Sequence, residues 1–213
     1  MSPSLWQRVV GCGFRLLYHE LACLYDPVSW AVSLGRWRRW QQTALAYLPP
    51  EGRVLEVGFG PGHLLADLAA AGYAVAGVDL SRHMVRRARR RLRRLGRPAP
   101  LALGRAHALP FAPGAFSAIV ATFPTPYIYD PAWIDQARRV LAPGGRLVVV
   151  QGATFLQSTP LTRSIDGLYR ITGQRGPGPD LVERLVAGGL AAWREAVEVQ
   201  GTRVHLVVAE KEL

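Results

Sequence analysis

The stretch that decides the fold of this 213-residue chain reads VLEVGFGPG over residues 54–62. It begins as a short apolar run of the kind that forms a buried strand, and the glycines that follow permit a tight turn with positive φ. A helix is expected directly after the turn, and its first backbone N–H groups can receive a carboxylate or a phosphate. The segment therefore predicts a strand, a glycine loop and a helix, with room for a ligand against bare backbone.

Strands and helices alternate after residue 50. Strands are expected at residues 53–57, 74–78, 101–103, 117–121, 146–151, 192–199 and 204–209. Helices are expected at residues 63–71, from a cap at Ser81 to near Gly96, at 131–141, and from a cap at Asp180 to Ala187, while residues 152–179 should be irregular apart from a short helix at 162–171. This alternation predicts a doubly wound α/β fold around a mostly parallel seven-stranded sheet.

The first fifty residues carry no strand signal. An amphipathic helix is expected over residues 5–24, because its basic residues fall on one face. Pro27 should end or interrupt it, and a second helix should cover residues 28–48 before the proline pair at 49–50. We therefore expect a helical segment over residues 1–48, followed by one structural unit over residues 49–213.

An acidic residue completes the pattern around the glycine loop. Asp79 closes the second expected strand, 21 residues after Gly58, where a carboxylate can bind both hydroxyls of a ribose. The dinucleotide fingerprint G-x-G-x-x-G is absent, because counting from Gly58 puts His63 at the third glycine position and counting from Gly60 puts Leu65 there. The residues thus indicate a nucleoside-binding crevice at the carboxyl ends of the strands, without the dinucleotide motif.

Four segments, in order, resemble the motifs of class I S-adenosylmethionine-dependent methyltransferases. The pattern E-x-G-x-G-x-G begins at Glu56 and is similar to the first motif of that family. The later matches are VAGVDLS at 75–81, ALPF at 108–111 with GAF at 114–116, and RVLAPGGRL at 139–147. The resemblance implies an enzyme with the Rossmann-like methyltransferase fold, S-adenosylmethionine as cofactor, and a cofactor-binding domain over residues 49–213.

The resemblance also implies ten cofactor-binding residues. Glu56 would hold the methionine ammonium, directly or through water, and Asp79 would bind the ribose. Thr122, at the tip of the fourth strand, would lie near the reactive methyl group. The other residues expected at the cofactor are Gly58, Gly60 and Gly62 at the methionine end and Leu80, Met84, Ala106 and His107 around the adenine.

The chain departs from the family pattern at two positions. The family commonly has Gly-Asp-Ala where this chain reads Gly104-Arg105-Ala106. Arginine cannot accept a hydrogen bond from the adenine amino group, so that contact must be lost or replaced. Ser117 stands where an acid is often found. Neither change touches the glycine loop or Asp79, so the expected cofactor is unaffected.

Methyl transfer from a sulfonium depends mainly on positioning, whereas a hydroxyl acceptor usually needs a general base. The catalytic candidates are Tyr127, Tyr129 and Asp130, and the alternative is that they only shape a loop. The segment FPTPY at 123–127 is only loosely similar to the Asp/Asn-Pro-Pro-Tyr motif of enzymes that methylate amino groups on bases. The missing amide or carboxylate counts against a nucleic-acid base as acceptor. No cluster with metal-ligand spacing occurs, so no metal is predicted.

The segment at 25–40 resembles the lead-in of quinone-biosynthesis C-methyltransferases and related lipid methyltransferases, the type 11 group. It implies that residues 1–48 form a lid over the active site and that the acceptor is a small or lipid-like molecule. Candidates for acceptor contact are Tyr25, Tyr127 and Tyr169. The alternatives are an RNA methyltransferase and a non-catalytic nucleotide-binding Rossmann domain.

The net charge of +11 is concentrated in one segment. Nine arginines and no acidic residue lie within residues 82–97. This helix is either a solvated surface, a contact for membrane phosphates or an anionic substrate, or an RNA contact. RNA recognition favours interleaved aromatic residues, which the segment lacks, so nucleic acid is the less favoured partner.

Composition also bears on location. No run of 18 apolar residues occurs, a secretory signal is not expected, and the two cysteines fit a reducing compartment. The chain is therefore expected to be cytoplasmic. Aromatic and basic residues in the N-terminal helix, together with the arginine-rich helix at 82–97, suggest peripheral contact with a membrane, and packing of a lid on the domain is the alternative.

Overall fold

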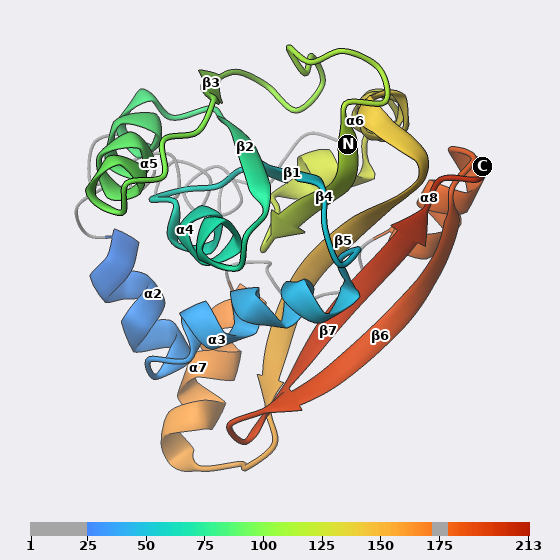
Figure 1. Cartoon of the computed structure of the whole chain (residues 1–213). Helices are drawn as coiled ribbons and strands as arrows, with labels where there is room; N and C mark the ends of the chain where they lie inside the picture. The colour runs from blue at the N-terminus through green and yellow to red at the C-terminus, as the bar shows by residue number, and fades with distance from the viewer. Residues whose placement is uncertain (1–24, 172–178) are drawn as a thin grey trace, which may run out of the picture.

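The computed structural model describes residues 25–171 and 179–213. Its centre is a seven-stranded sheet in the order β3-β2-β1-β4-β5-β7-β6, in which β7 runs antiparallel to both of its neighbours, β5 and β6, and the other pairs are parallel (Figure 1). The strands are β1 Arg53–Val57, β2 Ala74–Asp79, β3 Leu101–Leu103, β4 Phe116–Thr122, β5 Leu141–Phe155, β6 Ala191–Val199 and β7 Thr202–Glu210. The predicted doubly wound, mostly parallel seven-stranded sheet is confirmed.

Helices cover both faces of the sheet. Helices α4 His63–Ala70 and α5 Arg82–Arg94 cover one face, and α6 Pro131–Val140 and α8 Leu181–Ala187 cover the other. The remaining elements after β1 are α7 Pro160–Ile171 and a short 3-10 helix, η2, at Pro126–Tyr129. Two predicted caps are confirmed: Ser81 Oγ accepts the Met84 N–H at 3.4 Å, and Asp180 Oδ1 accepts the Val182 N–H at 2.9 Å. Among the described helices none is long and apolar enough to cross a membrane.

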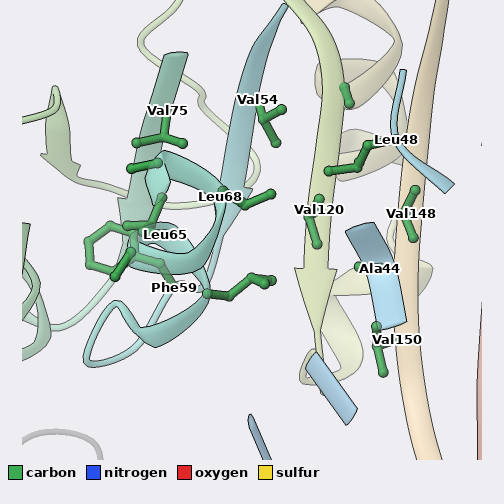
Figure 2. Close-up of a cluster of buried hydrophobic side chains, with 14 of the residues drawn as sticks. Ala44, Leu48, Val54, Phe59, Leu65, Leu68, Val75, Val120, Val148 and Val150 are labelled. Atoms are coloured by element: carbon green, nitrogen blue, oxygen red, sulfur yellow. The ribbon is translucent and has the colours of Figure 1, made fainter. Parts of the chain in front are cut away.

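Alternation along the central strands divides the core into two layers. Val54, Val120 and Val148 point to the face covered by α4 and α5, as Figure 2 shows for the layer around Leu65. Their immediate neighbours point to the opposite face, where α6 and α8 pack. This two-sided burial explains why the inner strands are apolar throughout their length.

The N-terminal part differs from the prediction. Instead of one helix over residues 28–48, the structure has α2 Tyr25–Ser33, α3 Trp37–Gln42 and a 3-10 helix, η1, at Thr43–Tyr47. Leu34 and Gly35 break the helix with φ values of 52° and 78°. Pro27 does not interrupt a helix but lies in the first turn of α2, where a missing N–H costs nothing. The helix predicted over residues 5–24 lies outside the described residues.

The fifth strand is longer than predicted. β5 continues through Phe155 because β7 pairs with it as far as the partners Phe155 and Thr202. The irregular structure expected from residue 152 therefore begins only after residue 155. The short helix that follows was predicted over 162–171 and is confirmed as α7.

We call residues 25–48 the lid segment. Its helix α3 contacts α4 and β5, and η1 contacts β5 and β7, so the segment crosses the face of the sheet on which α4 lies (Figure 1). Ala44 and Leu48 enter the same core layer as Leu65 and Leu68 of α4 (Figure 2). The segment is thus joined to the core of the domain through buried apolar side chains.

Candidate cofactor and acceptor site

The glycine loop, residues 58–62, joins β1 to α4 at the carboxyl edge of the sheet. Gly58, Gly60 and Gly62 have φ values of 73°, 53° and 77°. A Cβ on Gly60 would meet no atom within 4 Å, so its bare backbone borders open space. A Cβ on Gly62 would lie 2.6 Å from Ala88 Cβ, so this glycine allows α5 to pack against the start of α4. The three glycines therefore have different local environments.

Asp79 is fastened to the glycine loop. Its Oδ2 accepts the Gly60 N–H at 2.8 Å, and its Oδ1 accepts the Ser81 N–H at 2.7 Å. The residue is only 7% exposed. Each carboxylate oxygen can accept more than one hydrogen bond, so the two ribose hydroxyls of a nucleoside are compatible with these backbone contacts.

Glu56 is a second acidic residue at this edge of the sheet, and unlike Asp79 it accepts no hydrogen bond from the glycine loop. It is fully buried, and neither carboxylate oxygen has a hydrogen-bond partner among the described residues. Burial, together with the nearby charge of Asp79, raises the pKa of Glu56 well above its ordinary value, and the nearby backbone of Leu65 offsets only part of this rise. A buried carboxylate requires a partner to be stable in its charged form. A ligand ammonium would supply the missing hydrogen-bond donors and charge, so the site fits the methionine end of S-adenosylmethionine.

The residues expected around the adenine differ in exposure. Leu80 is 59% exposed beside Asp79, so it offers apolar surface to a flat ring. Met84 is fully buried in α5. Ala106 is half-buried, and His107 is exposed, with its Nε2 3.1 Å from Asp130 Oδ2.

The three catalytic candidates are placed differently by the structure. The Tyr127 hydroxyl donates to Val57 O at 3.3 Å, at the start of the glycine loop. Asp130 uses its carboxylate to cap α6 through the Ala132 N–H at 2.9 Å and to pair with His107. Tyr129 is half-buried against the core layer under α6. Of these three side chains, Tyr127 is the one that contacts the end of β1.

The lid segment reaches the tip of β4. Continuing the register in which Glu56 pairs with Val120 brings Thr122 level with Gly58. Thr122 Oγ1 accepts a hydrogen bond from Gln41 Nε2 at 3.0 Å, across 81 positions of sequence. Phe123 follows with a φ of 49°, and its ring lies 4.0 Å from that of Trp37. Sequence reasoning missed Gln41, because nothing local marks a lone glutamine in a helix as part of a site.

Polar contacts hold the lid segment in place. Arg38 Nε and Gln42 Nε2 donate to Asp67 Oδ2 of α4 at 3.0 and 2.9 Å, and Trp40 Nε1 donates to Thr202 Oγ1 of β7 at 2.8 Å. Burial opposes ionisation of Asp67, but the hydrogen bonds from Arg38 and Gln42 outweigh it and lower the pKa of this carboxyl. The helix α3 is thus attached to neighbours on both sides.

Some arginines of the helix α5 form hydrogen bonds within the protein. Asp26 of the lid segment binds His63 Nε2 at 3.1 Å and Arg87 at 2.6 Å, and the hydrogen bond from His63 contributes most to lowering the pKa of Asp26. Arg91 Nε donates to Pro61 O of the glycine loop at 3.1 Å. Arg89 Nη2 donates to Leu101 O at 2.8 Å. The remaining side of the helix exposes Arg82, Arg86, Arg90, Arg93 and Arg94.

Two further predictions concern acceptor contacts and metals. Tyr169 of α7 donates to Val32 O of α2 at 3.5 Å, so it lies where α7 meets the lid segment. Tyr25 begins α2. Within the described residues, no group of three or more His, Cys, Asp or Glu side chains could hold a metal ion.

Comparison with known proteins agrees with the geometry. A family profile described as a methyltransferase domain matches residues 54–145. A demethylmenaquinone methyltransferase of Thermus thermophilus is 34% identical over 192 residues, which cover 85% of this chain and 83% of that protein. A demethylmenaquinone methyltransferase of Beutenbergia cavernae is 36% identical over 156 residues, and the match spans 61% of its length.

A solved structure shows the same fold. Phosphoethanolamine N-methyltransferase 2 of Haemonchus contortus superposes with a TM-score of 0.63 at 17% identity, covering 84% of this chain and 53% of that protein. At this identity the likeness concerns the fold alone, and the sequence relatives carry the assignment. The chain belongs to the class I S-adenosylmethionine-dependent methyltransferase family.

Proposed function

We propose that this protein transfers the methyl group of S-adenosylmethionine to a small, quinone-like or lipid-like acceptor. The observation that carries the proposal is the 34% identity with the Thermus thermophilus demethylmenaquinone methyltransferase across most of both chains. The RNA methyltransferase and the non-catalytic nucleotide-binding domain gain no support from these relatives.

We assign the cofactor to the crevice at the carboxyl ends of β1 and β2. Glu56 is the proposed partner of the methionine ammonium, since its buried oxygens have no other donor among the described residues. Asp79 is the proposed ribose ligand, and Leu80 the apolar cover of the adenine. Arg105 is exposed and cannot replace the usual aspartate as an acceptor for the adenine amino group.

When bound, S-adenosylmethionine would supply a methyl group on a positively charged sulfur. A nucleophilic carbon or heteroatom of the acceptor would take the methyl carbon as its bond to sulfur breaks, S-adenosylhomocysteine would leave, and the acceptor would lose a proton. The chain contributes positioning and the exclusion of water. Trp37, Trp40 and Phe123 form an apolar cluster beside Thr122, where the acceptor would enter. Tyr127, at the end of β1, is the candidate for contact with the acceptor. The lid segment is proposed to close this half of the site.

We further propose peripheral contact with an anionic membrane, which would bring the protein to a lipid-like acceptor. Five exposed arginines on α5, Arg82, Arg86, Arg90, Arg93 and Arg94, favour phosphate groups, and Leu95 and Trp30 add apolar surface, being 53% and 66% exposed. Vesicles containing phosphatidylglycerol should bind the protein at low salt and release it at high salt, whereas phosphatidylcholine vesicles should not bind it. Equal binding to both would contradict the proposal.

The function itself is tested with methyl-labelled S-adenosylmethionine. The purified protein should transfer label to a chemically reduced demethylmenaquinone that carries a short prenyl chain. Asp79→Ala should lose most of this activity, because charged hydrogen bonds to a ribose contribute about 1.5–3 kcal/mol each. Binding of S-adenosylhomocysteine without any transfer to this quinol would show that the proposed acceptor class is wrong, and a labelled metabolite and lipid extract would then reveal the actual class.

A further inference from the structure

Gln41 of the lid segment brings a polar group to the tip of β4. It is 7% exposed, and its Nε2 donates to Thr122 Oγ1 at 3.0 Å. Its other amide atom, Oε1, is buried and has no hydrogen-bond partner among the residues that the structure describes. A buried carbonyl oxygen without a donor is unfavourable, and such atoms in native proteins call for an explanation. A donor on a bound ligand would provide one.

The amide lies on the acceptor half of the site rather than on the adenine half. Thr122, which holds the amide, is level with Gly58 at the end of β1. The Tyr127 hydroxyl reaches the same end of β1, and it would lie 3.6 Å from a Cβ on Gly58. The contact with Thr122 therefore places the amide of Gln41, with its unpaired oxygen, near the methionine end of the glycine loop.

The position of the amide is well defined, because α3 is attached on both sides of Gln41. The preceding residue, Trp40, donates to Thr202 Oγ1, and the following residue, Gln42, donates to Asp67 Oδ2. Trp40 is 1% exposed, so this part of the helix is also fixed by packing. A group held in this way binds a ligand with little loss of conformational freedom.

We propose that Gln41 recognises a hydroxyl group of the acceptor through its Oε1 and so acts as a positioning and specificity residue. This rests on the proposed function, because a reduced quinone carries hydroxyl groups on its ring. The neutral amide orients that hydroxyl but does not remove its proton. Gln41 thus differs from Glu56, whose unpaired buried oxygens suit a cation. The rings of Trp37 and Phe123, which pack against each other with an interplanar angle of 31°, supply apolar surface for the acceptor ring.

The proposal can be tested by binding alone. Protein saturated with S-adenosylhomocysteine is titrated with 1-naphthol and with 1-methoxynaphthalene, which cannot donate a hydrogen bond. The wild type should bind the naphthol about fivefold more tightly, as expected for one neutral hydrogen bond. Gln41→Met should reduce this preference to less than about twofold, while Gln41→Glu, which keeps an acceptor oxygen, should retain it.

Gln42→Met is the matched control, because it makes the same change at the next residue and removes only contacts with Asp67 and Arg39, away from Thr122. It should keep the preference for the naphthol. Affinity for S-adenosylhomocysteine should stay within about twofold of wild type in the Gln41 and Gln42 variants. If Gln41→Met folds poorly, Thr122→Val should lower the preference by releasing the amide. A Gln41→Met protein that still prefers the naphthol would overturn the proposal, and so would a wild type without any preference.

Turnover separates this inference from the proposed function. With the reduced demethylmenaquinone, Gln41→Met should raise KM more than it lowers kcat, because the hydrogen bond positions the acceptor before the reaction. Failure of the wild type to methylate this quinol, together with a Gln41-dependent preference for the naphthol, would reject the proposed acceptor but support hydroxyl recognition. Equal losses of affinity for S-adenosylhomocysteine and for the naphthol would instead show a structural role and overturn the inference.

Discussion

The cofactor half and the proposed acceptor half of the candidate site differ in how far apart in the sequence their contacting residues lie. On the cofactor half, the Gly60 N–H binds the Asp79 carboxylate across 19 positions of sequence, and both belong to one strand–helix–strand unit. On the acceptor half, Gln41 binds Thr122 across 81 positions. The first half is therefore a property of one continuous segment. The second exists only because the lid segment folds onto the sheet.

The comparison indicates which parts of the chain determine recognition of the cofactor and which determine recognition of the acceptor. A cofactor that is common to a family can be bound by a compact motif whose parts are neighbours in the chain. The proposed acceptor half is assembled from the lid segment and the tip of β4, so its chemistry can vary without any change in the glycine loop. Disturbing one half while measuring the other tests whether the two are independent.

The largest expected effect comes from Gly60→Val, which should abolish measurable binding of S-adenosylhomocysteine. The new side chain would fill the open space beside the loop, where the cofactor is proposed to lie. Gly201→Val is the matched control, since Gly201 also has a positive φ, of 72°, and no atom within 4 Å of its Cβ position. Both variants should lose about 1–3 kcal/mol of stability from backbone strain. Calorimetry that finds normal affinity in Gly60→Val would remove the loop from the site.

Glu56→Gln should weaken S-adenosylhomocysteine binding about tenfold, because a charge-assisted hydrogen bond to the ammonium is lost. The same change should stabilise the ligand-free protein. Folding raises the pKa of Glu56, so the folded protein favours the protonated side chain. The stability of the wild type is therefore fully present below the unfolded pKa of Glu56 and decreases as pH rises through its folded pKa. The advantage in Tm of the variant over wild type should therefore grow as pH increases above about 4.5.

Glu51→Gln, at an exposed position before β1, is the control and should change neither affinity nor Tm. If Glu56→Gln is less stable than wild type at pH 7, then Glu56 has an internal partner and its assignment to the ammonium fails.

Asp67→Asn should cost about 1 kcal/mol of stability by releasing Arg38 and Gln42 of the lid segment. The pKa of Asp67 is lowered on folding, so this stabilisation is present above the unfolded pKa and is lost as pH falls through the folded pKa. The Tm difference from wild type should accordingly shrink below about pH 4. Asp135→Asn, on the exposed side of α6, is the control. If the Tm difference between Asp67→Asn and wild type persists unchanged below about pH 4, the charge of Asp67 is not the source of the stabilisation.

The smallest effect is expected from Arg105→Asp, which restores the acid that is common in the family. It should tighten S-adenosylhomocysteine binding about threefold, since the exposed position limits the gain from a hydrogen bond to the adenine amino group. Arg97→Asp makes the same charge change at another exposed position and should not alter affinity. A loss of affinity in Arg105→Asp would indicate that the arginine itself contacts the nucleoside.

Much of the fold was predictable because its signals are local. The apolar runs of β1 and β4, the glycines at 58–62 and the cap at Ser81 each depend on neighbouring residues, and the structure has all of them as predicted. The break at Leu34 and Gly35 was missed, because the helical pattern on both sides resembles one continuous helix. The length of β5 was underestimated, because it depends on pairing with β7.

The amino-acid sequence by itself determined the family, the glycine loop and the acid at the end of β2, since steric freedom and hydrogen bonding within one segment are sufficient for these. Only the tertiary structure decided which polar groups meet across the sheet edge. It leaves the carboxylate of Glu56 unpaired, ties Arg87 and Arg91 to the lid segment and the loop, and places the amide of Gln41 at Thr122. The physical reason is that burial and pairing belong to surfaces brought together by folding, and no periodicity along the chain records them.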